Sequence, residues 1–261
     1  MKPFSLIQTK VENKIAYMML KNPPVNALNE RLLEELEQCI DELNNNPSVR
    51  AGILTGDGSF FVAGADIKEF TSLFGQVEEA KKAAQKGQAL CIKIEQSEKP
   101  IIAAINGACL GGGLELAMSC HLRIAVHEAK LGLPETKLGL IPGYGGTQRL
   151  TRLTNTATAL ELILTGRFID GREAERIGLV NRSVEADQLL QEAAGIAELI
   201  SQKSRLSVKA AMQAVFGGAE LPLENGLALE VEQFGALFAS QDVQEGVTAF
   251  IQKRPAVFRD Q

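Results

Sequence analysis

The stretch Lys99-Pro-Ile-Ile-Ala-Ala-Ile-Asn-Gly-Ala-Cys-Leu-Gly-Gly-Gly-Leu-Glu-Leu-Ala-Met-Ser-Cys120 decides the fold. The continuous apolar run from Ile101 to Ile105 predicts a buried strand. Gly107 relaxes the turn that follows, and three consecutive glycines open an apolar helix. That helix contains one acid, Glu115. Because charged side chains are rarely buried unless they are paired or have a chemical task, Glu115 is a candidate functional residue.

The three glycines at 111–113 have two interpretations. They can form a tight strand-to-helix turn, with Glu115 pairing inside the first turn of the helix. Alternatively, they let the backbone approach a ligand, and the free N–H groups at the helix start form an oxyanion site next to the acid. This stretch alone does not separate the two interpretations.

Composition limits the class of protein. The 261 residues, 45% of them hydrophobic, suffice for one large domain or two unequal ones. A formal net charge of -5 disfavours a surface that binds nucleic acid. No spacing typical of a metal site occurs among the four cysteines and two histidines, which are Cys39, Cys91, Cys109, Cys120, His121 and His127. We therefore expect no metal, and reduced, buried thiols.

The chain shows neither a signal sequence at its N-terminus nor an apolar run of membrane-spanning length. A cytoplasmic location and no membrane partner are the expectations that follow. Known cofactor motifs are also missing, since the glycines match neither the G-x-G-x-x-G of dinucleotide sites nor a phosphate loop. No G-x-S-x-G elbow is present for a serine hydrolase.

Strands and helices alternate from residue 15 to residue 183, which predicts an α/β core. Asn29 and Asp66 are predicted to cap the helices that follow them, and the polar segment from Thr71 to Lys86 is interpreted as an exposed helix or a lid. We expect two domains, residues 1–185 with the site and residues 186–261 as a helical subdomain. The predicted helices of the subdomain are 186–201, 205–216, 223–239 and 242–253, the last starting with a capping box of Asp242 and Glu245.

A second acid, Glu135, also lies beside glycines, in Leu131-Gly-Leu-Pro-Glu135 before Pro142-Gly-Tyr-Gly-Gly146. Three motifs then occur in order: Val62-Ala-Gly-Ala-Asp-Ile-Lys68, Asn106-Gly-Ala-Cys-Leu-Gly-Gly-Gly-Leu-Glu-Leu-Ala117, and Pro134-Glu135 with Leu138-Gly-Leu-Ile-Pro-Gly-Tyr-Gly-Gly-Thr-Gln-Arg149. In these motifs the chain resembles the crotonase, or enoyl-CoA hydratase/isomerase, superfamily. The likeness runs from Val25-Asn-Ala-Leu28 to Glu245-Gly-Val-Thr-Ala-Phe250.

The resemblance implies a catalytic set. The N–H groups of Ala65 and Gly112 would form the oxyanion hole for a thioester carbonyl. Glu135 would be the principal proton donor and acceptor, and Glu115 would hold and activate the water, which the amide of Gly143 also binds. Two acids facing one water titrate as a coupled pair.

The resemblance also implies a fold and partners. The fold would be a ββα spiral core with a C-terminal helical trimerisation subdomain, assembled as a trimer or as a dimer of trimers (a homohexamer). Coenzyme A would enter only as part of an acyl-CoA substrate, with no further cofactor. Its expected contacts are Leu28, Ala63, Asp66, Ile67 and Lys68, with Phe250 and Lys253 closing over the nucleotide end from a neighbouring subunit.

The predicted activity is hydration of trans-2-enoyl-CoA thioesters in fatty-acid β-oxidation. A 3,2-enoyl-CoA isomerase or another lyase of the superfamily is the alternative, because isomerases often keep an acid at only one of the two positions. RNA binding, reported for some members, is a remote alternative, since no basic stripe with interleaved aromatic residues occurs.

Overall fold

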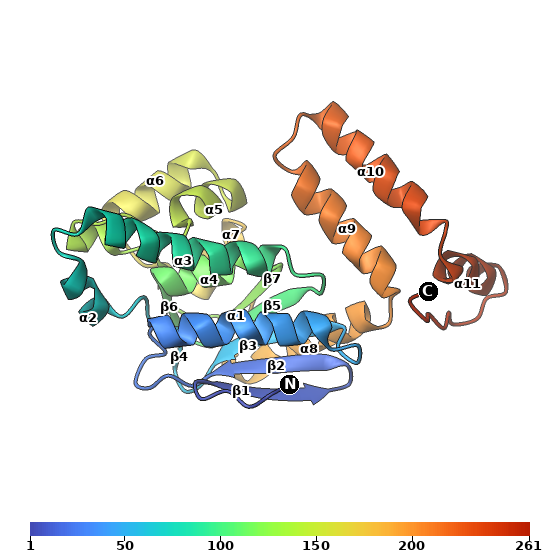
Figure 1. The fold of residues 1–261 in the computed structure, drawn as a ribbon, viewed down its shortest axis with the longest axis horizontal. Coiled ribbons are helices and arrows are strands. Elements are labelled where there is room, and N and C mark those ends of the chain that lie inside the picture. The colour runs from blue at the N-terminus through green and yellow to red at the C-terminus, as the bar shows by residue number, and fades with distance from the viewer. The chain divides into compact units, whose positions relative to one another are not determined.

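The computed structural model describes residues 1–261, which divide into two compact units, Met1–Gly195 and Ile196–Gln261 (Figure 1). The first unit contains every strand, and the second is helical. The predicted boundary at 185/186 lies earlier in the chain than this division. None of the helices combines the length and hydropathy needed to cross a bilayer.

A six-stranded sheet forms the centre of the first unit, in the order β1-β2-β3-β5-β7-β9. Its strands are β1 (Ile7–Glu12), β2 (Ile15–Leu20), β3 (Ala51–Gly56), β5 (Ile101–Ile105), β7 (Leu122–Val126) and β9 (Arg182–Val184). β1 and β2 form an antiparallel hairpin whose turn residues Asn13 and Lys14 have positive φ, and the other pairs are parallel. Every residue of β3 and β5 is buried, as expected for central strands of a parallel sheet.

A second, three-stranded parallel sheet was not predicted. It consists of β4 (Phe60–Val62), β6 (Ala108–Leu110) and β8 (Leu131–Gly132). Strands of two or three residues are too short to show an alternating pattern. The prediction that the chain passes directly from β5 through a turn into a helix is therefore wrong. Gly107 is needed for close approach, because a Cβ there would lie 1.9 Å from the Ser59 carbonyl oxygen.

The helices of the first unit follow the strands. They are α1 (Glu30–Asn45), α2 (Ile67–Phe70), α3 (Val77–Glu95), α4 (Gly112–Ser119), α5 (Gly146–Leu153), α6 (Thr156–Thr165) and α7 (Gly171–Arg176), with the 3₁₀ turns η1 (Thr71–Leu73), η2 (Glu135–Leu138) and η3 (Ala186–Gln188). α1 and α3 lie side by side (Figure 1). Asn29 accepts from the Leu32 N–H and Asp66 from the Lys68 N–H, so both predicted caps are confirmed. The segment interpreted as an exposed helix or lid is η1 followed by the first half of α3.

The remaining helices are α8 (Leu189–Ser201), which crosses the division, α9 (Arg205–Gly218), α10 (Leu223–Leu237) and α11 (Gln241–Ile251). α9 and α10 pack against each other. The predicted capping box is wrong, because Ser240 caps α11 by accepting from the Val243 N–H. The Asp242 carboxylate instead accepts from the Arg259 and Asp260 N–H groups of the C-terminal segment, and Glu245 pairs with Arg254.

Candidate active site

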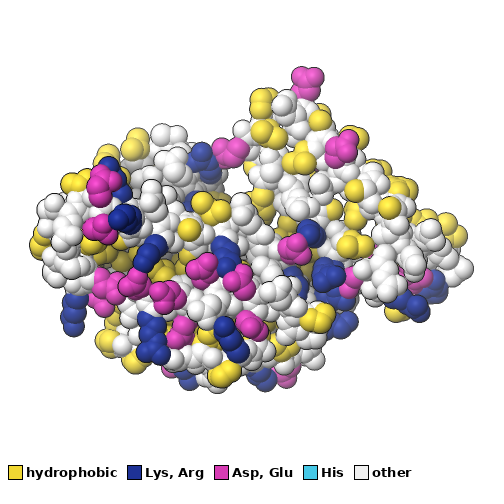
Figure 2. Space-filling model, viewed as in Figure 1, with side chains coloured by type: hydrophobic (Ala, Val, Ile, Leu, Met, Phe, Trp, Pro, Cys, Tyr) yellow, Lys and Arg dark blue, Asp and Glu magenta, His cyan; other side chains and the backbone are white.

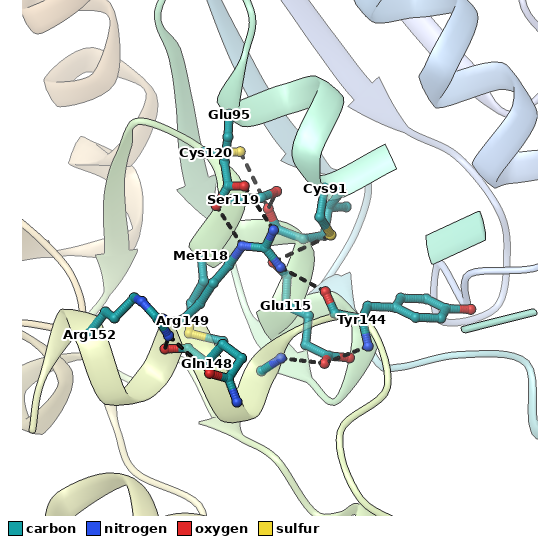
Figure 3. Close-up of polar contacts among 12 residues, drawn as sticks. Cys91, Glu95, Glu115, Met118, Ser119, Cys120, Tyr144, Gln148, Arg149 and Arg152 are labelled. Atoms are coloured by element: carbon teal, nitrogen blue, oxygen red, sulfur yellow. Dashed lines mark hydrogen bonds and ion pairs between the residues drawn. The ribbon is translucent and has the colours of Figure 1, made fainter. Parts of the chain in front are cut away.

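Glu115 lies in α4, a helix in which all eight residues are buried. Its side chain is buried as well, with the residue 2% exposed. One carboxylate oxygen, Oε1, accepts from the Tyr144 N–H at 2.8 Å and from the Gly146 N–H at 2.6 Å (Figure 3). Gly146 is the first residue of α5, so its amide has no acceptor within the helix. The loop before α5 and the first residue of α5 therefore supply the partners that the buried carboxylate requires.

Burial disfavours the charged form of Glu115, whereas nearby hydrogen-bond donors favour it. Burial dominates and raises the pKa of Glu115 to about 7, and the neighbouring Glu135 charge acts in the same direction. The amide donors of Gly146 and Tyr144 and the charge of Arg149 lower the pKa of Glu115 again, by a smaller amount. A carboxyl group with a pKa near neutral pH can both bind and release a proton under ordinary conditions.

Glu135 is the first residue of η2. Its Oε1 lies only 2.7 Å from the position that a Cβ on Gly111 would occupy, so the carboxyl group rests against the first glycine of the triple. Its Oε2 is buried and has no hydrogen-bond partner in the protein. Burial raises the pKa of Glu135 above its usual value. A buried, unpaired carboxyl oxygen of this kind can form a hydrogen bond with a bound molecule.

The two amides of the expected oxyanion hole have no hydrogen-bond acceptor within the protein. Gly112 is the first residue of α4, after Gly111 with its positive φ of 51°. Ala65 forms an isolated parallel bridge with Leu28, in which Leu28 donates to Gly64 and Asp66 donates to Leu28. The N–H of Ala65 takes no part in that bridge, so it is available to a ligand.

Close contacts bring these two backbone segments together. A Cβ on Gly111 would lie 3.8 Å from the Gly64 Cα, and a Cβ on Gly112 would lie 3.3 Å from the Leu28 side chain. The third glycine has a packing reason, since a Cβ on Gly113 would lie 2.3 Å from the Val62 carbonyl oxygen. Close packing, the first of the two interpretations, is therefore observed at the triple glycine, and the unpaired N–H of Gly112 is what the second interpretation requires.

Tyr144 places its ring between α3 and α4. A Cβ on Gly87 would lie 2.2 Å from a ring carbon, and one on Gly112 would lie 3.4 Å away. Burial raises the pKa of Tyr144 to about 12, so the phenol is neutral. Gly87 was missed from the sequence, because nothing near it in the chain indicates that an aromatic ring rests on it.

The other expected site residues occupy several places in the structure. The Gly143 carbonyl accepts from the Gln88 side chain at 2.9 Å. Ala63 donates its N–H to Val25, Leu28 is buried, and Ile67 is half exposed. The side chain of Lys68 has no partner in the structure. Phe250 and Lys253 belong to the second unit, where Phe250 is 85% exposed and Lys253 has a φ of 53°.

The histidines and cysteines are not among the candidate catalytic groups. His121 accepts from the Ile101 N–H at 3.0 Å, and burial lowers the pKa of His121 to about 4. Burial also raises the pKa of Cys91, whose thiol contacts the Glu115 carbonyl oxygen, to about 12. No group of three or more His, Cys, Asp or Glu side chains is arranged to hold a metal ion.

Comparison with known proteins adds to this geometry. The family described as enoyl-CoA hydratase/isomerase matches residues 10–261. A probable enoyl-CoA hydratase of Bacillus subtilis is 46% identical over 97% of this chain and 98% of its own. A crotonyl-CoA hydratase of Syntrophomonas wolfei is 43% identical over 95% of each chain. The crystal structure of an enoyl-CoA hydratase from Bacillus anthracis superposes with a TM-score of 0.94 at 37% identity, covering 98% of this chain and 100% of that one.

Proposed function

Because the chain belongs to the enoyl-CoA hydratase/isomerase family, we propose that it is an enoyl-CoA hydratase. It adds water across the trans-2 double bond of a 2-enoyl-CoA thioester and forms a 3-hydroxyacyl-CoA, in fatty-acid metabolism. One observation carries this assignment beyond the family. Two carboxyl groups are partly or fully buried near the triple glycine: Glu115 belongs to the helix that follows it, and Glu135 rests against Gly111. The charge of Glu135 raises the pKa of Glu115.

The amides of Ala65 and Gly112 are the proposed oxyanion hole. When water attacks Cβ, negative charge develops on the thioester oxygen. Two fixed N–H donors that are otherwise unpaired stabilise this charge, and each such donor typically lowers the barrier by about 2.7 to 4 kcal/mol. The positive end of α4, where Gly112 begins the helix, acts in the same direction.

Glu115 and Glu135 have different proposed tasks. Glu115, with two amide donors on one oxygen, is suited to the ionised state and binds and activates the water. Glu135, whose buried Oε2 has no partner in the protein, is the principal proton donor and acceptor and delivers a proton to Cα. The water oxygen bonds to Cβ while one of its O–H bonds breaks, and Glu115 takes up that proton. The π electrons move toward the carbonyl, and Glu135 gives its proton to Cα. The two acids together neither gain nor lose a proton. General acid–base catalysis of this kind contributes roughly 10²- to 10⁴-fold.

The acid pair favours hydration over double-bond migration. Both reactions move a proton at Cα, but only hydration requires a second acid to hold a water molecule. An isomerase of the same family is therefore the alternative outcome. Loss of the conjugated-thioester absorbance of crotonyl-CoA on incubation with the protein supports the proposal. No hydration at any acyl chain length, combined with conversion of a 3-enoyl-CoA, would assign the isomerase instead.

The rate of hydration should depend on pH through Glu115. Its pKa is raised to about 7, so the ionised form is complete only above that pH and falls roughly tenfold per unit below it. We expect kcat/KM for crotonyl-CoA to decline on the acid side with an apparent pKa near 7, which belongs to the coupled pair. A profile that stays flat down to about pH 5 would contradict this role.

The proposal includes assembly into trimers or dimers of trimers in the cytoplasm. Its support is the second unit, where Leu223, Val231, Phe234 and Phe238 of the α10 region and Phe250 of α11 are each more than 60% exposed. Figure 2 shows hydrophobic side chains at the surface of α9 and α10. Exposed apolar side chains gathered on one unit are typical of interaction sites. Phe250 and Lys253 then lie where a neighbouring subunit is approached.

A further inference from the structure

Arg149 of α5 forms a bidentate ion pair with Glu95. Its Nε donates to Glu95 Oε1 at 2.6 Å and its Nη2 donates to Glu95 Oε2 at 2.8 Å (Figure 3). Glu95 is the last residue of α3, so the pair ties the end of α3 to α5. Both side chains are largely shielded from solvent, with exposures of 14% for Arg149 and 27% for Glu95. Paired fork contacts of arginine with a carboxylate hold both groups in one geometry.

The third nitrogen of the same guanidinium reaches the loop that holds Glu115. Arg149 Nη1 donates to the Tyr144 carbonyl oxygen at 2.7 Å, and the Tyr144 N–H donates to Glu115 at 2.8 Å. The guanidinium thus holds one side of Tyr144 while Glu115 binds the other. Gly145, next in the chain, has a φ of 107°, and a Cβ there would lie 2.2 Å from Arg149 Nη1. The loop can adopt this path only with glycine at 145, because the φ value disfavours other residues and a Cβ would meet the guanidinium.

The charges around Glu115 are few. Glu135 of η2 raises its pKa, and Arg149 of α5 lowers it. The Cys91 thiol of α3 and the Tyr144 phenol, whose pKa values are raised to about 12, are both neutral near pH 7. Glu95 is paired with Arg149. Arg149 is therefore the cation that offsets the negative charge of the acid pair.

We propose that Arg149, held in place by Glu95, is a positioning residue for hydration. It fixes the Tyr144 carbonyl so that the Tyr144 and Gly146 amides remain on Glu115 Oε1, which leaves Glu115 ionised and aimed at the water. The inference rests on the proposed hydratase function. Arg149 does not touch the substrate in this scheme, since it acts through the loop from 142 to 146.

Three variants separate this role from simple support of the fold. Arg149→Met removes the charge and all three hydrogen bonds. Arg149→Lys keeps the charge but loses the fork. Glu95→Gln keeps the guanidinium but removes its anionic partner. The matched control is Arg152→Met, one turn further along α5, where the guanidinium bonds to Gln148 at the surface (Figure 3).

The measurements are kcat, KM and the pH profile with crotonyl-CoA. For Arg149→Met we expect a fall in kcat on the order of 10- to 100-fold, KM within about twofold, and an acid limb shifted to higher pH by about one unit. Arg149→Lys should lower kcat with a smaller pH shift, because it keeps the charge. Glu95→Gln should lower kcat less than Arg149→Met does. Arg152→Met should match the wild type.

Several results would overturn the inference. A wild-type kcat in Arg149→Met would overturn it. A variant whose KM changes as much as its kcat, with an unchanged pH profile, would also overturn it. If Arg149→Met fails to fold, Arg149→Lys and Glu95→Gln test the proposal instead. A wild-type kcat in both variants would refute the positioning role of Arg149. An inactive wild-type protein would remove the proposed function and this inference together, whereas an active wild type with unaffected variants would remove the inference alone.

Discussion

Replacing Glu135 with glutamine should lower kcat for hydration of crotonyl-CoA by about 10²- to 10⁴-fold. Glutamine has nearly the same shape but cannot deliver a proton to Cα. The Oε2 of Glu135 has no partner in the protein, so the substitution breaks no internal hydrogen bond at that atom. The fold should remain, as circular dichroism can verify.

A matched control for this variant is Glu128→Gln. Glu128 is a surface acid that pairs with Arg172, and its side chain is 69% exposed. The control should hydrate crotonyl-CoA at the wild-type rate, since exposed ion pairs contribute little. Turnover of Glu135→Gln within a few-fold of that control would remove Glu135 from the proposed chemistry.

Replacing Glu115 with glutamine should lower kcat by a similar factor, about 10²- to 10⁴-fold. The glutamine carbonyl can still accept from the Tyr144 and Gly146 amides, so the loop before α5 keeps its bonds. The variant lacks the charge that activates the water. Its kcat/KM profile should lose the acid limb near pH 7, since the group that gave rise to it is absent.

Glu161→Gln is the control for this second variant, because Glu161 is an exposed acid on α6 that pairs with Arg167. Steady-state kinetics across the pH range measures both proteins. If Glu115→Gln retained an acid limb near pH 7 and a rate close to that of the control, the ionisation assigned to Glu115 would belong to another group.

Local patterns predicted much of this molecule. The apolar runs of β3 and β5 have no polar residue except Thr55, so each can only be an interior strand. Asn29 and Asp66 cap their helices because a side-chain acceptor two or three residues before a free N–H group needs no distant partner. The glycine-flanked acids were visible for the same reason, since a carboxylate among apolar neighbours is unusual wherever it lies.

Contacts between distant segments could not be predicted from local sequence patterns. The short strands β4, β6 and β8 exist because each pairs with another strand far along the chain. The N-terminus of α11 was mispredicted because the C-terminal segment takes the Asp242 carboxylate that a capping box would use. In each case the competing partner is remote in sequence, and no window of neighbouring residues contains it.

The sequence by itself determined the α/β class and the helical C-terminal part, because these depend on residue types and spacing within single segments, and it indicated the two acids through the three motifs that resemble the crotonase superfamily. Only the tertiary structure decided which groups contact the two acids. It brought the Tyr144 and Gly146 amides to Glu115, set Glu135 against Gly111, and joined Arg149 to Glu95. The physical reason is that a buried carboxylate is stabilised by whichever donors the fold places within about 3 Å, and those donors come from other elements.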